Sequence, residues 1–216
     1  MRTIFYSITL ATFVFACSSE ENVSVEKNGS VVVEAEDFFN QSNDDVRAWH
    51  IISASDSSAL EGTAFSSRHH NASGNAYIMI LPDTRITHDD ELVPGENYTE
   101  EAGTIAVVSY KVKFNTPGKY YVWVRAFSTG TEDNGVHVGI NDTWPDSGRR
   151  MQWHDGKFEW TWESKQRTQE VHSGVPEQIY LEVPKPGIHV ISFSMREDGF
   201  AMDKWAMTQK YEKPVD

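Results

Sequence analysis

Residues 104–127 read TIAVVSYKVKFNTPGKYYVWVRAF, and this stretch decides the fold class. From residue 104 to residue 114, side chains that favour burial alternate with side chains that favour solvent. This period of two is typical of a strand with one buried face. Residues 115–118 (NTPG) are a turn signal, and the apolar pattern resumes over residues 119–127. We therefore predict two strands that pair as a β-hairpin.

Short apolar segments of the same kind recur on both sides of this stretch, and no segment has a sustained helical period with caps. We predict further strands at residues 31–36, 76–81, 136–140, 178–183, 188–195 and 200–207. Many short strands separated by turns are typical of a β-sandwich or jelly roll. We expect one all-β domain with two long loops, at residues 88–102 and 141–172, both long enough to be functional.

The N-terminus resembles that of a bacterial lipoprotein. A positive Arg2 precedes an apolar run over residues 4–15, too short to span a bilayer, and Cys17 is the only cysteine among the 216 residues. We expect a signal peptide at residues 1–16, lipidation of Cys17, a polar tether at residues 17–29 and a folded module at residues 30–212. The acidic residues after Cys17 resemble an export signal to the outer face of the outer membrane, where we expect the lipid-anchored protein. An ordinary secretory signal with a spare cysteine is the alternative.

The composition limits the partners. The formal net charge is −13, from 19 basic and 32 acidic residues. We expect no nucleic-acid partner, because the chain lacks the basic field that displaces counterions. Hydrophobic residues make up 39% of the chain, which is enough to form a core.

Four of the seven tryptophans lie within residues 144–162. Indole rings pack on the flat C–H faces of sugars, and polar neighbours bind the hydroxyl groups. Trp144 and Trp153 lie among Gly, Asp and Pro residues, so we favour an exposed binding site for them. Trp160 and Trp162 are two residues apart, as on one face of a strand, and core packing remains equally open for them. Arg149 and Arg150 are the basic residues beside these aromatics; they would pair with a glycan sulfate or carboxylate, or with local carboxylates.

Three carboxylates stand where strand chemistry disfavours them. Alternation places Glu34 and Glu36 on one face of the first strand, and Asp203 interrupts the apolar strand at residues 200–207. Like charges on one face repel unless a cation or hydrogen-bond donors neutralise them. A cation site and simple surface exposure both remain open on this pattern alone.

The order of four motifs resembles a known family. VEAEDF at residues 33–38, PGKYYVWVR at 117–125, PGIHVI at 186–191 and DGFAMDKW at 198–205 occur in turn. The chain thereby resembles carbohydrate-binding modules of families 6 and 35, the module attached to family 115 glycoside hydrolases and modules of marine agarases. The resemblance covers residues 31–208 and implies a jelly roll that binds a polysaccharide, such as an agar-type galactan, without catalysis.

The resemblance also implies site residues. It implies a structural calcium ion held by Glu34, Glu36 and Asp203. It implies a sugar site either in a cleft among the loops or on the concave sheet face. For the loop cleft, the candidate residues are Trp144, Trp153, Arg150, Asn134 and Asp198. A glycoside hydrolase is the implied partner, and the two long loops depart from the shorter modules of the family.

Two other classes of function remain as alternatives. A small polysaccharide lyase or hydrolase would use histidines with Tyr98, or paired carboxylates such as Glu100 and Glu101. The eight histidines have no recognised metal or triad spacing. An adhesion module that binds protein through its Trp-rich loop is the second alternative. A glycan-binding assay run together with a turnover assay separates these classes.

Overall fold

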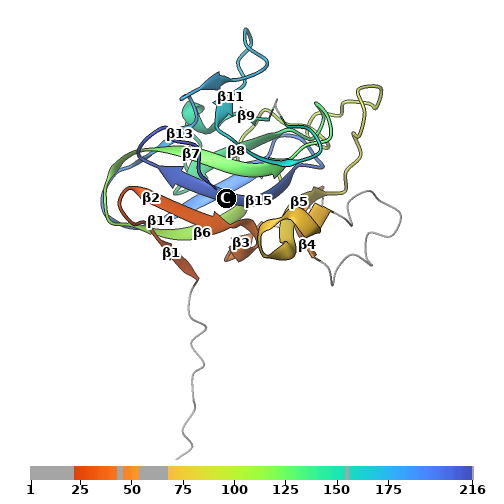
Figure 1. Cartoon of the computed structure of the whole chain (residues 1–216). Helices are drawn as coiled ribbons and strands as arrows, with labels where there is room; N and C mark the ends of the chain where they lie inside the picture. The colour runs from red at the N-terminus through yellow and green to blue at the C-terminus, as the bar shows by residue number, and fades with distance from the viewer. Residues whose placement is uncertain (1–21, 43–45, 54–67, 154–155, 216) are drawn as a thin grey trace, which may run out of the picture.

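The computed structural model describes residues 22–42, 46–53, 68–153 and 156–215. The predicted signal peptide and Cys17 lie outside these residues. The described chain forms two β-sheets that pack face to face, and its helical segments are short 3-10 turns (Figure 1). The predicted all-β sandwich is therefore confirmed. Among the described residues, no helix is long and apolar enough to cross a membrane.

The first sheet runs in the order β1-β6-β14-β8-β9-β11-β12, and β3 also pairs with β6. Its central pairs are antiparallel, with Tyr110 of β6 opposite Ile191 of β14. The bounds of its strands are β1 (Val23–Val25), β3 (Asn40–Gln41), β6 (Val108–Phe114), β8 (Gly135–Ile140), β9 (Met151–Gln152), β11 (Lys165–Gln166), β12 (Val175–Pro176) and β14 (Gly187–Met195).

The second sheet runs in the order β10-β7-β15-β5-β4; β13 also pairs with β7, and β2 with β15. The bounds of its strands are β2 (Ser30–Glu34), β4 (Ala48–Ser53), β5 (Ala76–Leu81), β7 (Gly118–Phe127), β10 (Trp160–Glu163), β13 (Tyr180–Val183) and β15 (Ala201–Thr208). The 3-10 turns are η1 (Ala35–Asp37), η3 (Arg68–Asn71), η4 (Ser73–Asn75) and η5 (Asp146–Gly148). Turns η1 and η3 pack against β5.

Apolar residues from alternate positions of both sheets form the main core. Tyr110 of β6 contacts Trp205 of β15 edge to face, with ring centroids 5.1 Å apart. Phe193 of β14 contacts the same indole at 5.4 Å. All three side chains are buried. Because aromatic rings bury large areas and favour such tilted contacts, this cluster holds the two sheets together.

The predicted hairpin is wrong. β6 belongs to the first sheet and β7 to the second, so the chain crosses between the sheets at the 115–117 turn. Phe114 and Tyr120 meet across the core, with ring centroids 5.0 Å apart. The two strands pack through their apolar faces instead of pairing edge to edge. A period of two is the same in both arrangements and does not distinguish them.

The predicted tether at residues 17–29 is wrong over its described part. β1 pairs in parallel with β6 through Val23, Ser24 and Val25. The Glu26 side chain is fully buried, and its Oε2 accepts hydrogen bonds from the backbone N–H groups of Asn115 (2.8 Å) and Thr116 (3.0 Å). The module therefore begins before residue 30.

One of the two predicted loops lacks strands in the structure, and the other contains them. Residues 82–107 contain no named strand and include the whole of the predicted loop at 88–102. The predicted loop at 141–172 contains η5, β9, β10 and β11 instead. Figure 1 shows β9 and β11 together at one end of the molecule, beyond β8. Short strands of two to four residues carry too weak a pattern to be found from periodicity.

Candidate functional site

Loops from four parts of the chain surround a cleft of about 360 Å³, which we call the Tyr98 cleft. Titratable and polar side chains dominate its wall, and the residues that line it are Arg85, His88, Leu92, Tyr98, Thr131, Glu132, Arg167, His172, Arg196 and Glu197. The chain places them after β5, before β8, after β11 and after β14.

Hydrogen bonds hold the first of these loops in place. Buried Asn97 accepts from the backbone N–H of Val93 (2.8 Å) and donates to the carbonyl of Glu91 (2.9 Å). The backbone N–H of Thr99 donates to the carbonyl of Arg196, and that of Asp198 donates to the carbonyl of Asn97. The loop is thereby tied to the segment after β14, which pre-organises the wall of the cleft.

Tyr98 separates the Tyr98 cleft from a neighbouring groove that runs from Pro94 to Ile105. Its ring is half-buried, and the Arg196 guanidinium lies over it, 5.1 Å from the centroid. Its hydroxyl donates a short hydrogen bond to Glu100 Oε1. Burial, followed by this hydrogen bond, raises the pKa of the Tyr98 hydroxyl. Tyr98 therefore offers a flat apolar surface with a neutral hydroxyl.

Charged groups of both signs surround Tyr98. Arg196 is buried and donates to Glu197 Oε1 through a short hydrogen bond, and to Glu100 Oε1 at 3.3 Å. Arg150 Nε lies 3.2 Å from Glu100 Oε2. The structure thus places predicted Arg150 beside the cleft wall, paired with a carboxylate.

Buried His137 lies behind this wall. Its Nδ1 accepts from the backbone N–H of Arg150 (3.1 Å), so its Nε2, 3.2 Å from the carbonyl of Thr99, carries the proton. Burial lowers the pKa of the His137 imidazole to about 4. The neutral ring connects the 98–101 segment to residue 150 and supports the cleft from inside.

The structure places Asn134 and Asp198 behind the cleft wall and not on its surface. Asn134 is 1% exposed, and its backbone N–H donates to Glu197 Oε2 at 3.0 Å. Asp198 is fully buried; its Oδ2 forms an ion pair with Arg47 (3.0 Å) and accepts from the Thr84 N–H and hydroxyl groups. The expectation that these two side chains contact sugar directly is wrong. They position Glu197 and the loop after β5.

The expectation that Trp153 forms an exposed binding site is also wrong. It is 2% exposed, packs against Phe200 at 5.1 Å between ring centroids, and donates through Nε1 to the carbonyl of Thr161 (3.2 Å). It therefore belongs to the core and is not an exposed sugar platform. Trp160 and Trp162 are buried too, but on the outer face of the second sheet, in two small clusters apart from the main core. Trp162 lines a groove there together with Trp123 and Tyr211, so the main core does not account for this pair.

Trp144 is half-buried outside the core. A Cβ added to Gly103 would lie 2.2 Å from its Nε1, and one added to Gly139 would lie 2.8 Å from its Cδ2. The indole therefore lies directly on the backbone of both glycines. This contact pins the loop before β6 onto β8, and the structure does not place Trp144 among the residues that line the Tyr98 cleft.

The three predicted metal ligands converge near Ser73, at the end of β2. The Ser73 hydroxyl donates to Glu34 Oε1 (2.8 Å), and its N–H donates to Asp203 Oδ1 (2.7 Å). Glu36 is on the 3-10 turn η1 and not on the predicted strand. Burial first, and then the nearby carboxylates Glu34 and Asp203, raise the pKa of the Glu36 carboxyl to about 7.

Glu34 and Glu36 fit a hard cation in part. Glu34 Oε2 and Glu36 Oε2 are buried without a hydrogen-bond partner, and calcium takes oxygen ligands of this kind. Asp203 does not fit as well, because Arg125 Nη1 lies 2.5 Å from its Oδ2. Within the described residues, no three His, Cys, Asp or Glu side chains are grouped closely enough to hold a metal. Glu34, Glu36 and Asp203 are therefore not arranged to bind one metal ion together.

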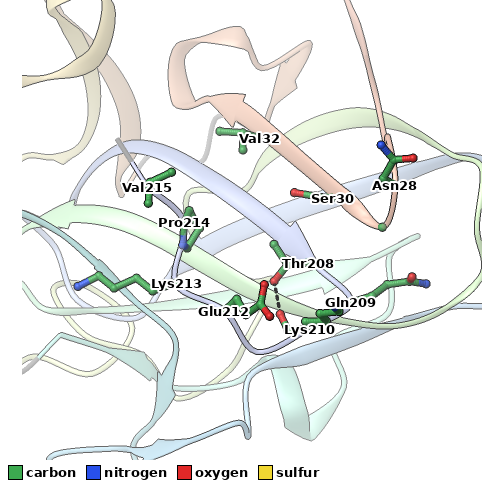
Figure 2. A pocket seen from close by; sticks show the side chains of 11 residues that line it. Asn28, Ser30, Val32, Thr208, Gln209, Lys210, Glu212, Lys213, Pro214 and Val215 are labelled. Atoms are coloured by element: carbon green, nitrogen blue, oxygen red, sulfur yellow. Dashed lines mark hydrogen bonds between the residues drawn. The ribbon is translucent and has the colours of Figure 1, made fainter.

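A larger groove, of about 600 Å³, lies between the start of β2 and the segment after β15. Figure 2 shows Asn28, Ser30 and Val32 on one side of it and residues 208–210 and 212–215 on the other. None of the residues that line it is aromatic. It therefore lacks the flat ring that sugar binding favours, and we regard the Tyr98 cleft as the better candidate.

Sequence reasoning missed most of the cleft. Arg85, Arg167 and Arg196 were not singled out, and Tyr98 entered only as part of the enzyme alternative. One available signal was the position of these arginines beside long loops in a chain with only 19 basic residues.

The fold and this site define a β-sandwich module with a polar cleft among the loops at one edge. Residues 59–213 match the family described as the glycosyl hydrolase family 115 C-terminal domain. The chain belongs to this family. It is also 59% identical over 184 residues to uncharacterized protein P23 of Formosa agariphila, an alignment that covers 85% of this chain and 44% of that protein. The chain thus spans less than half the length of this relative.

Solved structures show more distant likeness. A family 35 carbohydrate-binding module from Clostridium thermocellum has a TM-score of 0.46 and 14% identity, over 82% of this chain and 96% of that one. The C-terminal family 6 module of LamC, a marine laminarinase from Zobellia galactanivorans, has a TM-score of 0.42 and 14% identity, over 83% and 99%. The family match carries the assignment, and nothing further rests on these two.

Proposed function

We propose that the chain binds a polysaccharide in the Tyr98 cleft and does not cleave it. The observation that carries this proposal is a half-buried tyrosine ring set among arginine and glutamate side chains on loops held by hydrogen bonds. Sugar recognition needs a flat apolar surface for the ring face and charged or polar groups for the hydroxyl edge. An agar-type galactan is the first polymer to try.

The states of Tyr98 and His137 favour binding over catalysis. A tyrosine that removes a proton needs a lowered pKa, whereas the pKa of Tyr98 is raised and its hydroxyl donates to Glu100. His137 is buried, with its Nδ1 accepting from the Arg150 N–H and its Nε2 facing the Thr99 carbonyl. Neither group is arranged as the base that a lyase mechanism requires.

Affinity electrophoresis against a panel of marine polysaccharides tests the proposal. Tyr98→Ala should abolish retardation, because it removes the ring, while Tyr98→Phe should keep most of it. Phe158→Ala is the matched control, since Phe158 is exposed and does not line the cleft. We expect a dissociation constant of roughly micromolar to millimolar, because an open cleft leaves part of each sugar solvated.

The same polysaccharides are incubated with the protein and assayed for new reducing ends and for unsaturated products. Turnover that disappears in Tyr98→Phe would replace the binding proposal with a lyase. Binding by Tyr98→Ala equal to that of the parent would show that another surface, such as the outer face of the second sheet, is the sugar site.

The proposed setting is the bacterial cell surface, with the module lipid-anchored at Cys17 in the outer membrane. The family name supports a glycoside hydrolase as partner. Calcium at Glu34 and Glu36 is a proposed structural ion, supported by the two buried oxygens without hydrogen bonds. When bound, it would neutralise the carboxylates that now face each other beside Ser73.

A further inference from the structure

The Tyr98 cleft concentrates positive charge in an acidic protein. Arg85, Arg167 and Arg196 line it, and Arg150 lies beside Glu100 at its wall. The whole chain, by contrast, has 32 acidic and 19 basic residues. Two exposed histidines, His88 and His172, also line the cleft and add positive charge when protonated. Four arginines therefore gather where the molecule as a whole repels anions.

Among the residues that the structure describes, two of these arginines find acceptors for few of their N–H groups. A guanidinium has five N–H donors. The Arg167 side chain donates one hydrogen bond, to Gln152 Oε1 at 3.3 Å. The Arg85 side chain makes no hydrogen bond with the described residues, and its nearest carboxylate oxygen, on Glu132, is 3.8 Å away. Both side chains are partly exposed in the cleft.

Arg47 shows what a structural arginine looks like in the same protein. Its guanidinium donates to Asp198 Oδ2 from Nε (3.3 Å) and Nη2 (3.0 Å), to the carbonyl of Val46 and to the Thr84 hydroxyl. These contacts leave little capacity for a ligand. Within the described part of the chain, Arg85 has one long ion pair, with Glu132 at 3.8 Å, and Arg167 has one hydrogen bond, to Gln152, so both keep N–H donors for a ligand.

Repulsion between the arginines supports the same conclusion. Burial, and next the neighbouring Arg196, lower the pKa of Arg167. Glu197 lines the cleft as well, but burial raises the pKa of its carboxyl, and its oxygens already accept from Arg196 and from the Asn134 N–H. An anion in the cleft would relieve this repulsion and accept from the free donors.

We infer that the Tyr98 cleft recognises a negatively charged sugar residue, whose sulfate ester or carboxylate is bound by Arg85 and Arg167. The planar guanidinium fork matches both oxyanions. Tyr98 would contact the ring that carries the anionic group. This inference rests on the proposed function, because it specifies the ligand of the same cleft.

The test uses two matched pairs of polymers with the full-length mature protein. A sulfated galactan is compared with the same galactan after desulfation, and a polyuronate with its carboxyl-reduced form. We expect binding to at least one charged polymer and roughly tenfold weaker binding to its neutral counterpart, as loss of a charge-assisted contact implies. The pair that shows the difference identifies sulfate or carboxylate as the bound group.

Arg85→Gln and Arg167→Gln should each weaken binding to the charged polymer by about tenfold and reduce its dependence on salt, because exposed charge pairs are screened. Arg149→Gln is the control: it makes the same charge change at a residue that is exposed and does not line the cleft. Melting temperatures of all variants confirm folding.

Three outcomes overturn the inference. Neutral polymers that bind as tightly as charged ones, with sensitivity to Tyr98→Ala, would leave the proposed function intact and remove the anionic ligand. Arginine variants that bind the charged polymer like the parent would do the same. Absence of binding to every polymer would refute the inference and the proposed function together.

Discussion

Replacement of Trp153 by alanine should destabilise the protein without removing the sugar site. Trp153 is 2% exposed, its ring contacts Phe200 at 5.1 Å, and its Nε1–H group donates to the carbonyl of Thr161. Truncation of a buried tryptophan costs about 3–5 kcal/mol, because a cavity replaces the ring. For a domain of this size, about 2–4 °C of melting temperature is lost per kcal/mol, which gives a fall of roughly 6–20 °C.

The measurement is a thermal melt followed by circular dichroism, together with affinity electrophoresis in the cold, where the variant is still folded. Binding should be close to that of the parent. Trp144→Ala is the comparison, since Trp144 is half-buried against Gly103 and Gly139, and its melting temperature should fall less. An unchanged melting temperature for Trp153→Ala with lost binding would refute the placement of Trp153 in the core.

Three further predictions concern protonation, calcium and anchoring. The pKa of buried His137 is lowered to about 4 from an unfolded value of 6.5, so the unfolded state binds more protons between these values. Its contribution, about 3 kcal/mol, is complete above pH 6.5 and is lost as the pH falls towards 4. Urea unfolding of the parent across this range should show the loss, and a His137→Gln variant with the same pH slope would contradict it. If Glu34 and Glu36 hold calcium, calcium at a hundred times its dissociation constant should stabilise the protein by about 2.7 kcal/mol. In a thermal melt, Glu36→Gln should abolish the response to calcium and to chelator. A parent protein whose melting temperature responds to neither counts against the site. Cys17→Ala should shift the protein out of the membrane fraction, and a processed variant that stays membrane-bound would show that no lipid at Cys17 anchors it.

The sequence by itself determined the strands with long, regular patterns. Residues 108–114 alternate as predicted, with Val108, Tyr110, Val112 and Phe114 all buried in the core. The predicted strand at residues 76–81 has the bounds of β5. Alternation identifies the first segment because one face of the strand must leave water, whatever its partner is. The second is identified by a short apolar run that ends at Pro82 and Asp83.

Only the tertiary structure decided which strands pair. The predicted hairpin partners β6 and β7 lie in opposite sheets, since an apolar face is buried equally well against a facing sheet. The burial of Trp153 was missed for a similar reason. Its Gly- and Asp-rich neighbours indicate a loop, but the burial of the ring depends on Phe200, 47 positions away in the chain.

The candidate site depends on the fold more strongly still. Tyr98, Glu132, Arg167 and Arg196 come from four separate segments, and none of them has a local motif that marks it as a site residue. They line one cleft because the sandwich brings the ends of β8, β11 and β14 beside the loop after β5. Contacts between residues so distant in the chain follow from sheet packing, which the local pattern of each strand does not encode.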